Sequence, residues 1–218
     1  MIRPAQPEDL QRIRDIEVAA GQLFRAIGMD SVADDPPMTE EELAAYQRAG
    51  HAWVATGPTG TAIAYILVDV LGVWAHIEQV TVDPDQGRRA IGSTLIAHAE
   101  RWATWAGLRG LSLTTFTNVP WNAPYYERLG FRHLPENEWT DEHALVVLRE
   151  KQHGLGVWQR SVMVKESRAS RPGLNSSVPE GTQGSRRDGT VTRRRTLWAA
   201  EASTQTVRSR DGGVKTNC

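Results

Sequence analysis

The sequence contains a single cysteine, Cys218, among its 218 residues. One cysteine excludes a disulfide within the chain and a cysteine metal cluster. The six histidines are scattered, with no pair at a spacing typical of metal ligands, so we expect no bound metal. No run of eighteen apolar residues occurs, and we therefore expect no membrane span. Residues 1–9 also lack the apolar stretch of a secretion signal, which favours a cytoplasmic protein.

Charges of opposite sign gather in two parts of the chain. Residues 167–218 hold ten Lys and Arg and four Asp and Glu, a net charge of +6, which leaves −7 on residues 1–166. The later part is rich in Ser, Gly, Thr and Arg and lacks apolar periodicity. Its Arg193–Arg195 run is more typical of solvated charge than of nucleic-acid contact. The sequence thus predicts one domain over 1–166 and a disordered basic tail over 167–218.

One segment, residues 80–96, combines a strand, a basic turn with small residues and the start of a helix. Val80 and Val82 are typical of a strand, and Pro84 ends it because proline cannot donate to a sheet ladder. Apolar residues then recur at helical spacing from Ile91. A helix N-terminus presents unpaired N–H groups and partial positive charge, which can hold a phosphate. Taken alone, this pattern is compatible with a phosphate site and with an ordinary solvated helix start.

A second segment, residues 118–132, predicts a short helix followed by a strand. Asn122 or Ala123 can begin the helix, with a proline in its first turn. Gly130 stands where a helix commonly ends in the left-handed conformation, and Phe131 starts the next strand.

Both segments resemble motifs of the GNAT family of N-acetyltransferases. The family's first motif, Gln/Arg-x-x-Gly-x-Gly/Ala before a helix, corresponds to Gly87–Gly92, and its second, Tyr-x-x-x-Gly-Phe, corresponds to Tyr126–Phe131. The first motif departs from the family pattern because Gly87 replaces Gln or Arg and Ala90 replaces Gly. Neither change removes the backbone N–H groups that would bind a pyrophosphate. The resemblance covers roughly residues 1–165.

The order of the expected elements is that of the same family. Periodicity and capping signals predict β-α-α-β-β-β-α-β-α-β-β, and early hairpins followed by βα units favour a mixed α/β (α+β) sheet. Residues 28–37 are expected to form a loop, and 143–152 a short helix or connection. The resemblance implies a mostly antiparallel sheet of about seven strands flanked by helices. Its fourth and fifth strands, here 73–82 and 111–116, would splay apart to admit the pantetheine chain.

Transfer of an acetyl group from a thioester to an amine needs a neutral amine, a donor for the developing oxyanion and a proton for the leaving thiolate. A carboxylate can deprotonate an alkylammonium, and our candidate is Glu78 on strand 73–82, although a solvated strand face is an equal alternative. His76 could assist, but a lone strand histidine is more often structural. The resemblance favours Tyr126, rather than the neighbouring Tyr125, as the acid that protonates the thiolate.

The resemblance also implies which residues hold acetyl-CoA. The backbone N–H of Val80 would stabilise the oxyanion, and backbone groups of Val80 and Val82 would pair with pantetheine. The expected cofactor-binding residues are Val80, Val82, Gly87, Arg88, Arg89, Ala90, Ile91, Gly92, Ser93 and Asn122. Asn118 and Asn122 could bind pantetheine or cap a helix. On the acceptor side, Phe24 is the expected substrate-contacting residue, with packing as the alternative.

We therefore interpret the chain as an acetyl-CoA-dependent N-acetyltransferase that acts by direct transfer in a ternary complex. The net charge of −7 on residues 1–166 favours a cationic acceptor: a small molecule, an amino acid or polyamine, or a protein amine. The alternative is a non-catalytic acyl-CoA-binding regulatory module, favoured by the departures at Gly87 and Ala90. We expect neither a membrane nor a nucleic acid as partner, and the family resemblance allows a homodimer.

Overall fold

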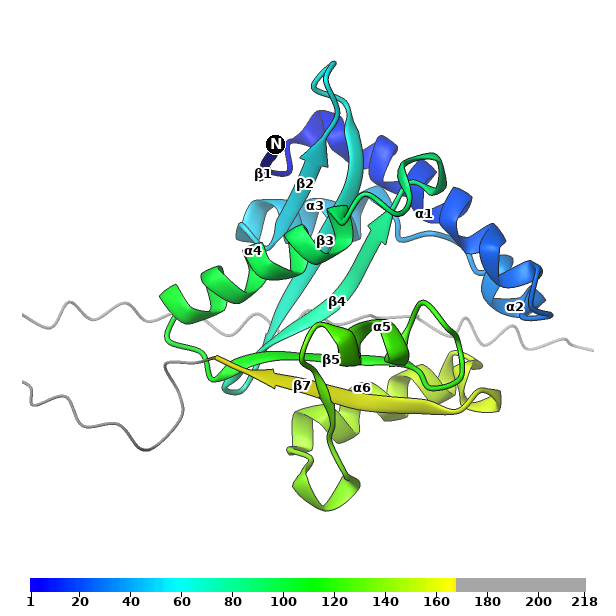
Figure 1. Cartoon of the computed structure of the whole chain (residues 1–218), viewed down its shortest axis with the longest axis vertical. Helices are drawn as coiled ribbons and strands as arrows, with labels where there is room; N and C mark the ends of the chain where they lie inside the picture. The colour runs from blue at the N-terminus through cyan, green and yellow to red at the C-terminus, as the bar shows by residue number, and fades with distance from the viewer. Residues whose placement is uncertain (168–218) are drawn as a thin grey trace, which may run out of the picture. The chain divides into compact units, whose positions relative to one another are not determined.

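The structure is a computed structural model that describes residues 1–167, so the tail predicted for 167–218 lies, apart from Ser167, outside the described residues. Its centre is a seven-stranded sheet in the order β1-β2-β3-β4-β5-β7-β6 (Figure 1). The strands are Ile2–Pro4 (β1), Ala52–Thr56 (β2), Ala62–Leu71 (β3), Trp74–Val82 (β4), Gly110–Phe116 (β5), Arg132–His133 (β6) and Arg160–Glu166 (β7). All neighbours are antiparallel except β4 and β5, which are parallel. The predicted mixed, mostly antiparallel sheet is confirmed.

The α-helices of the described residues are Leu10–Arg25 (α1), Asp30–Ala33 (α2), Glu40–Ala49 (α3), Ile91–Trp105 (α4), Ala123–Arg128 (α5) and Asp141–Gln152 (α6). The loop expected at 28–37 contains α2, which is too short for its periodicity to be seen in the sequence. The segment expected as a short helix or connection is the twelve-residue α6. Thr140 caps this helix by accepting the N–H of His143 at 3.4 Å. No helix within residues 1–167 has both the length and the apolar character needed to cross a membrane.

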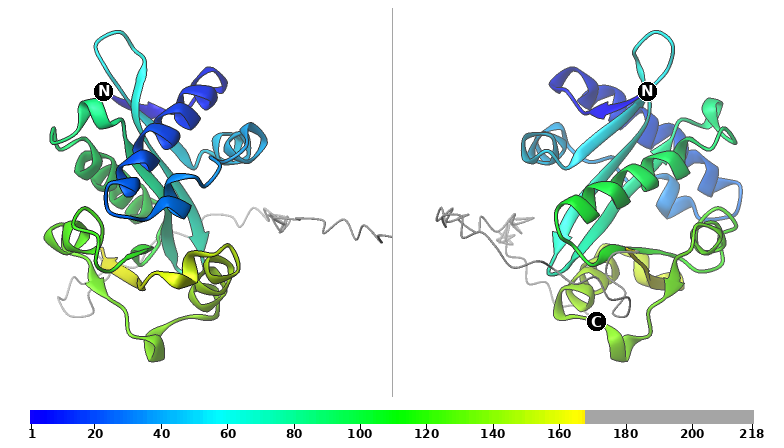
Figure 2. Two further views of the ribbon diagram at one scale, coloured as in Figure 1. Left: turned by 90° about the vertical axis from the view of Figure 1, so that its right-hand side faces the viewer. Right: turned by 60° about the vertical axis from the view of Figure 1, so that its left-hand side comes forward.

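Helices cover both faces of the sheet. Ile66 and Ala75 point to one face and belong to a buried core shared with α4 and α5. Tyr65 and Leu67 point to the opposite face, because side chains alternate along a strand, and they pack with α1 and α3. Figure 2 shows α1 and α4 on opposite faces. α6 packs through Val147 over the end of the sheet that contains β7.

β4 and β5 are paired over only the first part of their lengths. Residues 74–77 of β4 pair with 110–113 of β5, and the pairing ends there. Beyond this point the two strands diverge (Figure 1). On its other side, β4 stays paired with β3 as far as Val82. The splay implied by the family resemblance is therefore present.

The divergence coincides with an irregularity in β4. Ile77 is opposite Val68 of β3, whereas Gln79 is opposite Leu67, so Glu78 is an extra residue in a β-bulge. A bulge bends its strand and increases the local twist, which accounts for β4 leaving β5 directly after Ile77. The alternating pattern of apolar residues in the sequence does not show where such an extra residue falls.

The turn between β4 and α4 has a left-handed backbone at two residues that are not glycine. Arg88 has a φ of 62° and Ala90 a φ of 58°. Ala90 is also the N-cap of α4 and provides no side-chain cap. The start of the turn is held to α1, because Asp83, the first residue after β4, forms an ion pair with Arg12. Ala90 therefore occupies a position that suits the glycine of the family pattern.

Ala90→Gly is expected to stabilise the fold. The left-handed conformation costs a residue with a side chain about 1–2 kcal/mol. Glycine loses about 0.5–1 kcal/mol more backbone entropy than alanine on folding, so we expect the free energy of unfolding to rise by about 0.5–1 kcal/mol, measured by urea unfolding. Ala106→Gly is the matched control, because Ala106 ends the same helix with a right-handed backbone and should be destabilised by glycine. An equal loss of stability in both variants would contradict the strain at Ala90.

Candidate functional site

The edge of β4 that faces the divergence carries free backbone groups. The N–H of Asp83 donates to the carbonyl of Ile63 in β3 at 2.9 Å. Backbone groups of successive strand residues point alternately to the two sides of an antiparallel strand, so those of Val80 and Val82 point away from β3. On that side β5 has already diverged. Val80 and Val82 thus present their N–H and C=O groups to the opening between the strands.

This edge leads into the basic turn and the N-terminus of α4. The first N–H groups of an α-helix have no acceptor within the helix, and no side chain caps α4 at Ala90. The hydroxyl of Ser93 donates to the carbonyl of Ala90 at 2.8 Å and so does not cap these N–H groups. Arg88 and Arg89 are exposed in the same turn. The structure therefore brings the expected residues 87–93 together as one patch of N–H groups and positive charge.

The two adjacent tyrosines of α5 have different surroundings. The hydroxyl of Tyr125 lies at the basic turn, where a Cβ on Gly92 would be only 3.1 Å from it. Tyr126 packs edge-on against Phe131, with ring centroids 5.6 Å apart. Burial raises the pKa of Tyr126 above its usual value, Tyr125 raises it further and Arg160 lowers it, so this hydroxyl keeps its proton at neutral pH. The place of Tyr125 at the turn is a feature that sequence reasoning missed.

Glu78 keeps an exposed surface, although protein groups surround much of its carboxylate. The pKa of Glu78 is raised to about 7: burial is the main cause, Asp69 and Glu150 also raise it, and Arg160 and Arg149 act in the opposite direction. Solvent access on one side is compatible with desolvation on the others. Because solvent reaches the side chain, the shift is not a measure of folding stability. At pH 7 the carboxyl is divided between its charged and neutral forms, which suits a group that accepts and releases a proton.

His76 is a buried side chain with a partner inside the sheet. Its Nδ1 lies 3.0 Å from Oγ of Ser112 on β5. The pKa of His76 is lowered to about 3, chiefly by burial and also by the charges of His143 and Arg160, so the imidazole is neutral. This arrangement agrees with the structural interpretation of His76. Among residues 1–167, no group of three or more His, Cys, Asp or Glu side chains is arranged to hold a metal ion.

An ion pair that sequence reasoning missed lies on the β5 side of the opening. Arg160 of β7 donates to Glu150 of α6 through Nε at 2.8 Å and through Nη2 at 2.6 Å. Thr114 of β5 also donates to Glu150, and the Arg160 guanidinium lies over the Phe116 ring at 4.5 Å. Both charged side chains are largely buried. No local pattern could reveal this group, because its members come from three separate elements.

A second missed contact joins α1 to the bulge of β4. Nε2 of Gln79 donates to Oε1 of Glu17 at 2.9 Å, and the N–H of Met38 donates to Oε2 at 3.3 Å. Burial raises the pKa of Glu17, the bonds from Gln79 and Met38 lower it, and Asp35 raises it. The buried hydroxyl of Tyr65 interacts with Glu17 and with Thr81. Glu17 thus lies next to the bulge that contains Glu78.

Phe24, near the end of α1, reaches across the opening. Its ring centroid lies 5.7 Å from that of Phe116, at the end of β5, and 5.8 Å from that of Trp121. Phe24, the residue expected to contact the substrate, therefore connects α1, which packs on β4, with β5, the other diverging strand.

The asparagines of the second motif do not cap α5 with their side chains. Asn122 is the N-cap residue of α5, as predicted, but its side chain makes no cap hydrogen bond. Asn118 instead donates to Oε1 of Gln159 at 3.4 Å. The side chain of Asn122 is thus not committed to the helix that it begins.

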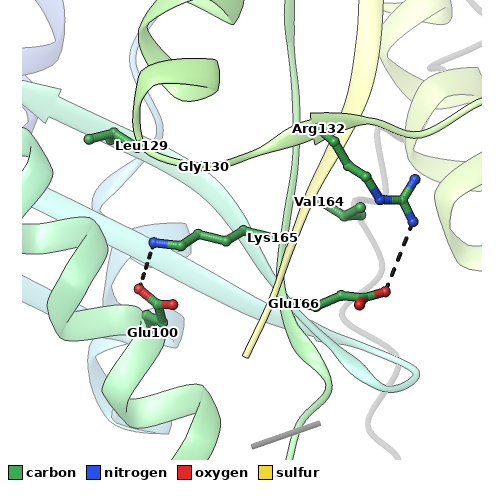
Figure 3. Close-up of a pocket in the computed structure, with 7 residues that line it drawn as sticks. All are labelled: Glu100, Leu129, Gly130, Arg132, Val164, Lys165 and Glu166. Carbon is green, nitrogen blue, oxygen red and sulfur yellow. Dashed lines mark hydrogen bonds and ion pairs between the residues drawn. The ribbon is translucent and has the colours of Figure 1, made fainter. Parts of the chain in front are cut away.

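A cavity of about 510 Å³ lies away from these groups. It is lined by Glu100, Leu129, Gly130, Arg132, Val164, Lys165 and Glu166, which include none of the expected site residues (Figure 3). Its charges are already paired, because Lys165 bonds to Glu100 at 2.8 Å and Arg132 lies 3.9 Å from Glu166. We therefore place the candidate site at the divergence of β4 and β5, not in this cavity.

Comparison with solved structures shows the same fold in several proteins. Rv2747 from Mycobacterium tuberculosis, solved in complex with CoA and NLQ, is 19% identical with a TM-score of 0.58, over 76% of this chain and 98% of that one. An alanine N-acetyltransferase of a ribosomal protein from Escherichia coli is 19% identical with a TM-score of 0.54, over 82% and 99%. Ard1 from Thermoplasma volcanium is 16% identical with a TM-score of 0.54, over 76% and 96%.

These identities are low, and the three structures show similarity of fold alone. The sequence gives the more direct assignment. Residues 12–131, more than half of the chain, match the sequence model of the Acetyltransferase (GNAT) family. That match includes the strand, the basic turn and the tyrosine-bearing helix described above. The chain belongs to the GNAT family of acetyltransferases.

Proposed function

We propose that this protein is an acetyl-CoA-dependent N-acetyltransferase that moves an acetyl group to a primary amine. One observation carries the proposal: the open edge of β4 at Val80 and Val82 runs from Glu78 into the uncapped, basic N-terminus of α4. The same edge thus offers partners for an extended amide chain, for a pyrophosphate and for an amine. Membership of the acetyltransferase family and the CoA complex of Rv2747 support this assignment.

The cofactor would lie along this edge. The N–H groups of residues 91–93, with Arg88 and Arg89, suit a pyrophosphate because they combine backbone donors with full positive charges. The amide groups of pantetheine would pair with Val80 and Val82 like an added strand. Tyr125 at the turn would contact the same part of CoA, and the uncommitted side chain of Asn122 would be a further donor.

The chemical step needs two proton transfers. Glu78 would take a proton from the acceptor ammonium, directly or through water, and the neutral nitrogen would attack the thioester carbonyl. The N–H of Val80 would stabilise the oxyanion of the tetrahedral intermediate. As the C–S bond breaks, the thiolate would take the proton of Tyr126. Because the sequence has no cysteine before residue 218, direct transfer is favoured over an acetyl-cysteine intermediate.

A non-catalytic acyl-CoA-binding module is the second candidate, favoured by the left-handed Ala90 in place of a glycine. Release of free thiol from acetyl-CoA with a panel of amines separates the two functions. Amine-dependent release supports the transferase, whereas CoA binding without release on any amine supports the binding module. A homodimer and a cytoplasmic setting stay predictions from the sequence.

Glu78→Gln is expected to change the pH dependence of the reaction. With a pKa of about 7, Glu78 is a competent base only above that pH, so kcat/KM for the acceptor should rise through pH 7 in the wild type. The pH profile of the variant should lose this inflection and show only the ionisation of the amine. The variant should also turn over about a hundredfold more slowly. Because solvent reaches this side chain, the substitution should change the free energy of unfolding by no more than about 0.5 kcal/mol.

The control for Glu78→Gln is Glu41→Gln, which removes an exposed carboxylate from α3. It should leave both the rate and the pH profile unchanged. An inflection near pH 7 that persists in Glu78→Gln would assign that ionisation to another group.

Tyr126→Phe is expected to lower kcat by about tenfold to a hundredfold, because the thiolate loses its proton donor. The Kd for acetyl-CoA should stay within about twofold, since the lost hydroxyl is not part of the basic turn. Tyr125→Phe should instead raise the Kd for acetyl-CoA and leave kcat near the wild-type value, because the hydroxyl of Tyr125 lies against Gly92. Stopped-flow thiol release and calorimetric titration measure the two quantities. Equal kcat in Tyr126→Phe and the wild type at saturating substrates would remove Tyr126 from the mechanism.

A further inference from the structure

A buried ion pair between α6 and β7 lies where β4 and β5 begin to diverge. The ladder between these strands ends with Ile77 opposite Leu113, so Glu78 and Thr114 are the next residues of the two strands. The hydroxyl of Thr114 donates to the carboxylate of Glu150, the acidic member of the pair. The pair is therefore attached to β5 at the level of Glu78.

Glu78 and Thr114 extend to the same face of the sheet. On this face Nδ1 of His76 lies 3.0 Å from Oγ of Ser112, and side chains two residues apart on a strand share a face. Thr114 follows Ser112 by two residues and bonds to α6. Glu78 follows His76 by two residues, at the start of the bulge, and charged residues of α6 act on its pKa. The ion pair thus lies on the side of the sheet to which Glu78 points.

The pair is held in one place by bonds between three elements. Arg160 donates to Glu150 through two nitrogens, and its Nη2 also donates to Oγ1 of Thr114 at 3.2 Å. Its guanidinium lies over the ring of Phe116, which contacts the ring of Phe24. The exposed fraction is 15% for the side chain of Arg160 and 17% for that of Glu150. Because desolvation offsets much of the attraction in a buried ion pair, stability alone gives little reason for this one.

The two charges of the pair act on Glu78 in opposite directions. Burial is the main cause of the raised pKa of Glu78, and among the nearby charges Glu150 raises this pKa whereas Arg160 lowers it. Burial also raises the pKa of Tyr126, and Arg160 opposes that rise, so its charge reaches both groups proposed to transfer a proton. The other titratable groups that interact with Glu78 come from β3, α6 and α3, and they are Asp69, Arg149 and Tyr46.

We propose that Glu150 and Arg160 are positioning residues for the reaction: fixed as one buried pair at the start of the divergence, their opposite charges keep the carboxyl of Glu78 available as a base at neutral pH. The inference rests on the proposed N-acetyltransferase function. An unpaired arginine at this place would favour the charged form of Glu78 and make it a weaker base, and an unpaired glutamate would keep it protonated. Neither member of the pair takes the proton itself, and both act through Glu78.

The test follows the ionisation of Glu78 by NMR in the full chain labelled with carbon-13 at the glutamate carboxyls. The signal that is lost in Glu78→Gln identifies the residue, and low ionic strength is used because salt screens charges that solvent reaches. Glu150→Gln keeps an oxygen that can accept from Arg160 and removes the negative charge, so the titration of Glu78 should move to lower pH by about half a pH unit. Arg160→Gln should move it to higher pH by a similar amount.

Two further variants separate the effect of charge from that of structure. The double variant Glu150→Gln with Arg160→Gln lacks both charges, and Arg160→Lys keeps the positive one, so both should titrate within about 0.2 pH unit of the wild type. The double variant also removes the unpaired buried carboxylate that could prevent Arg160→Gln from folding. Glu138→Gln is the matched control, because Glu138 accepts from Arg132 at 3.2 Å in an exposed pair that does not act on Glu78.

The pH profile of kcat/KM for thiol release, measured with acetyl-CoA and the most reactive amine of the panel, should move with the NMR titration in every variant. An unchanged titration in Glu150→Gln and Arg160→Gln, or a shift of both in one direction, would overturn this inference alone. Absence of thiol release with every amine of the panel would overturn the proposed function and, with it, the role of the pair in a reaction.

Discussion

The early end of the β4–β5 ladder is the constraint on which the rest of the site depends. Four residue pairs join the strands, and the extra residue Glu78 then bends β4 away while β3 keeps it in the sheet. Backbone N–H and C=O groups require partners, so the edge at Val80 and Val82 must be satisfied by solvent or by a ligand. The fold thus creates an unfilled strand position in the middle of a sheet, where both neighbours are held by extensive pairing.

The same bend decides which side chains act together. Because the bulge inserts one residue, Gln79 is set opposite Leu67 and so shares the face of α1, where it bonds to Glu17. Without the insertion, every later residue of β4 would point to the other face. Val80 and Val82 would then leave the core that they share with α4. A single inserted residue therefore connects the open backbone edge at Val80 and Val82 with the side chains that face α1.

The sequence could predict the parts of this arrangement that are local. The helical spacing that begins at Ile91 predicted the start of α4, because this signal lies inside the helix itself. The Glu150–Arg160 pair and the Glu17–Gln79 bond join residues 10 and 62 positions apart from different elements. The strand order and the packing of α6 and α1 bring these residues together. A local sequence pattern contains no information about strand order or about helix packing.

Charge separates the two halves of the site. The turn after β4 carries the exposed Arg88 and Arg89, whereas the opposite face carries Glu17, Asp69 and Glu78 without ion pairs among the residues described. A phosphate is attracted to the first group and repelled by the second, and the reverse holds for an ammonium. In the proposed function, CoA would lie at the basic turn and the ammonium at Glu78. Burial is the main cause of the raised pKa of Glu78, and the charges of Asp69 and Glu150 raise it further, which suits a group that accepts a proton.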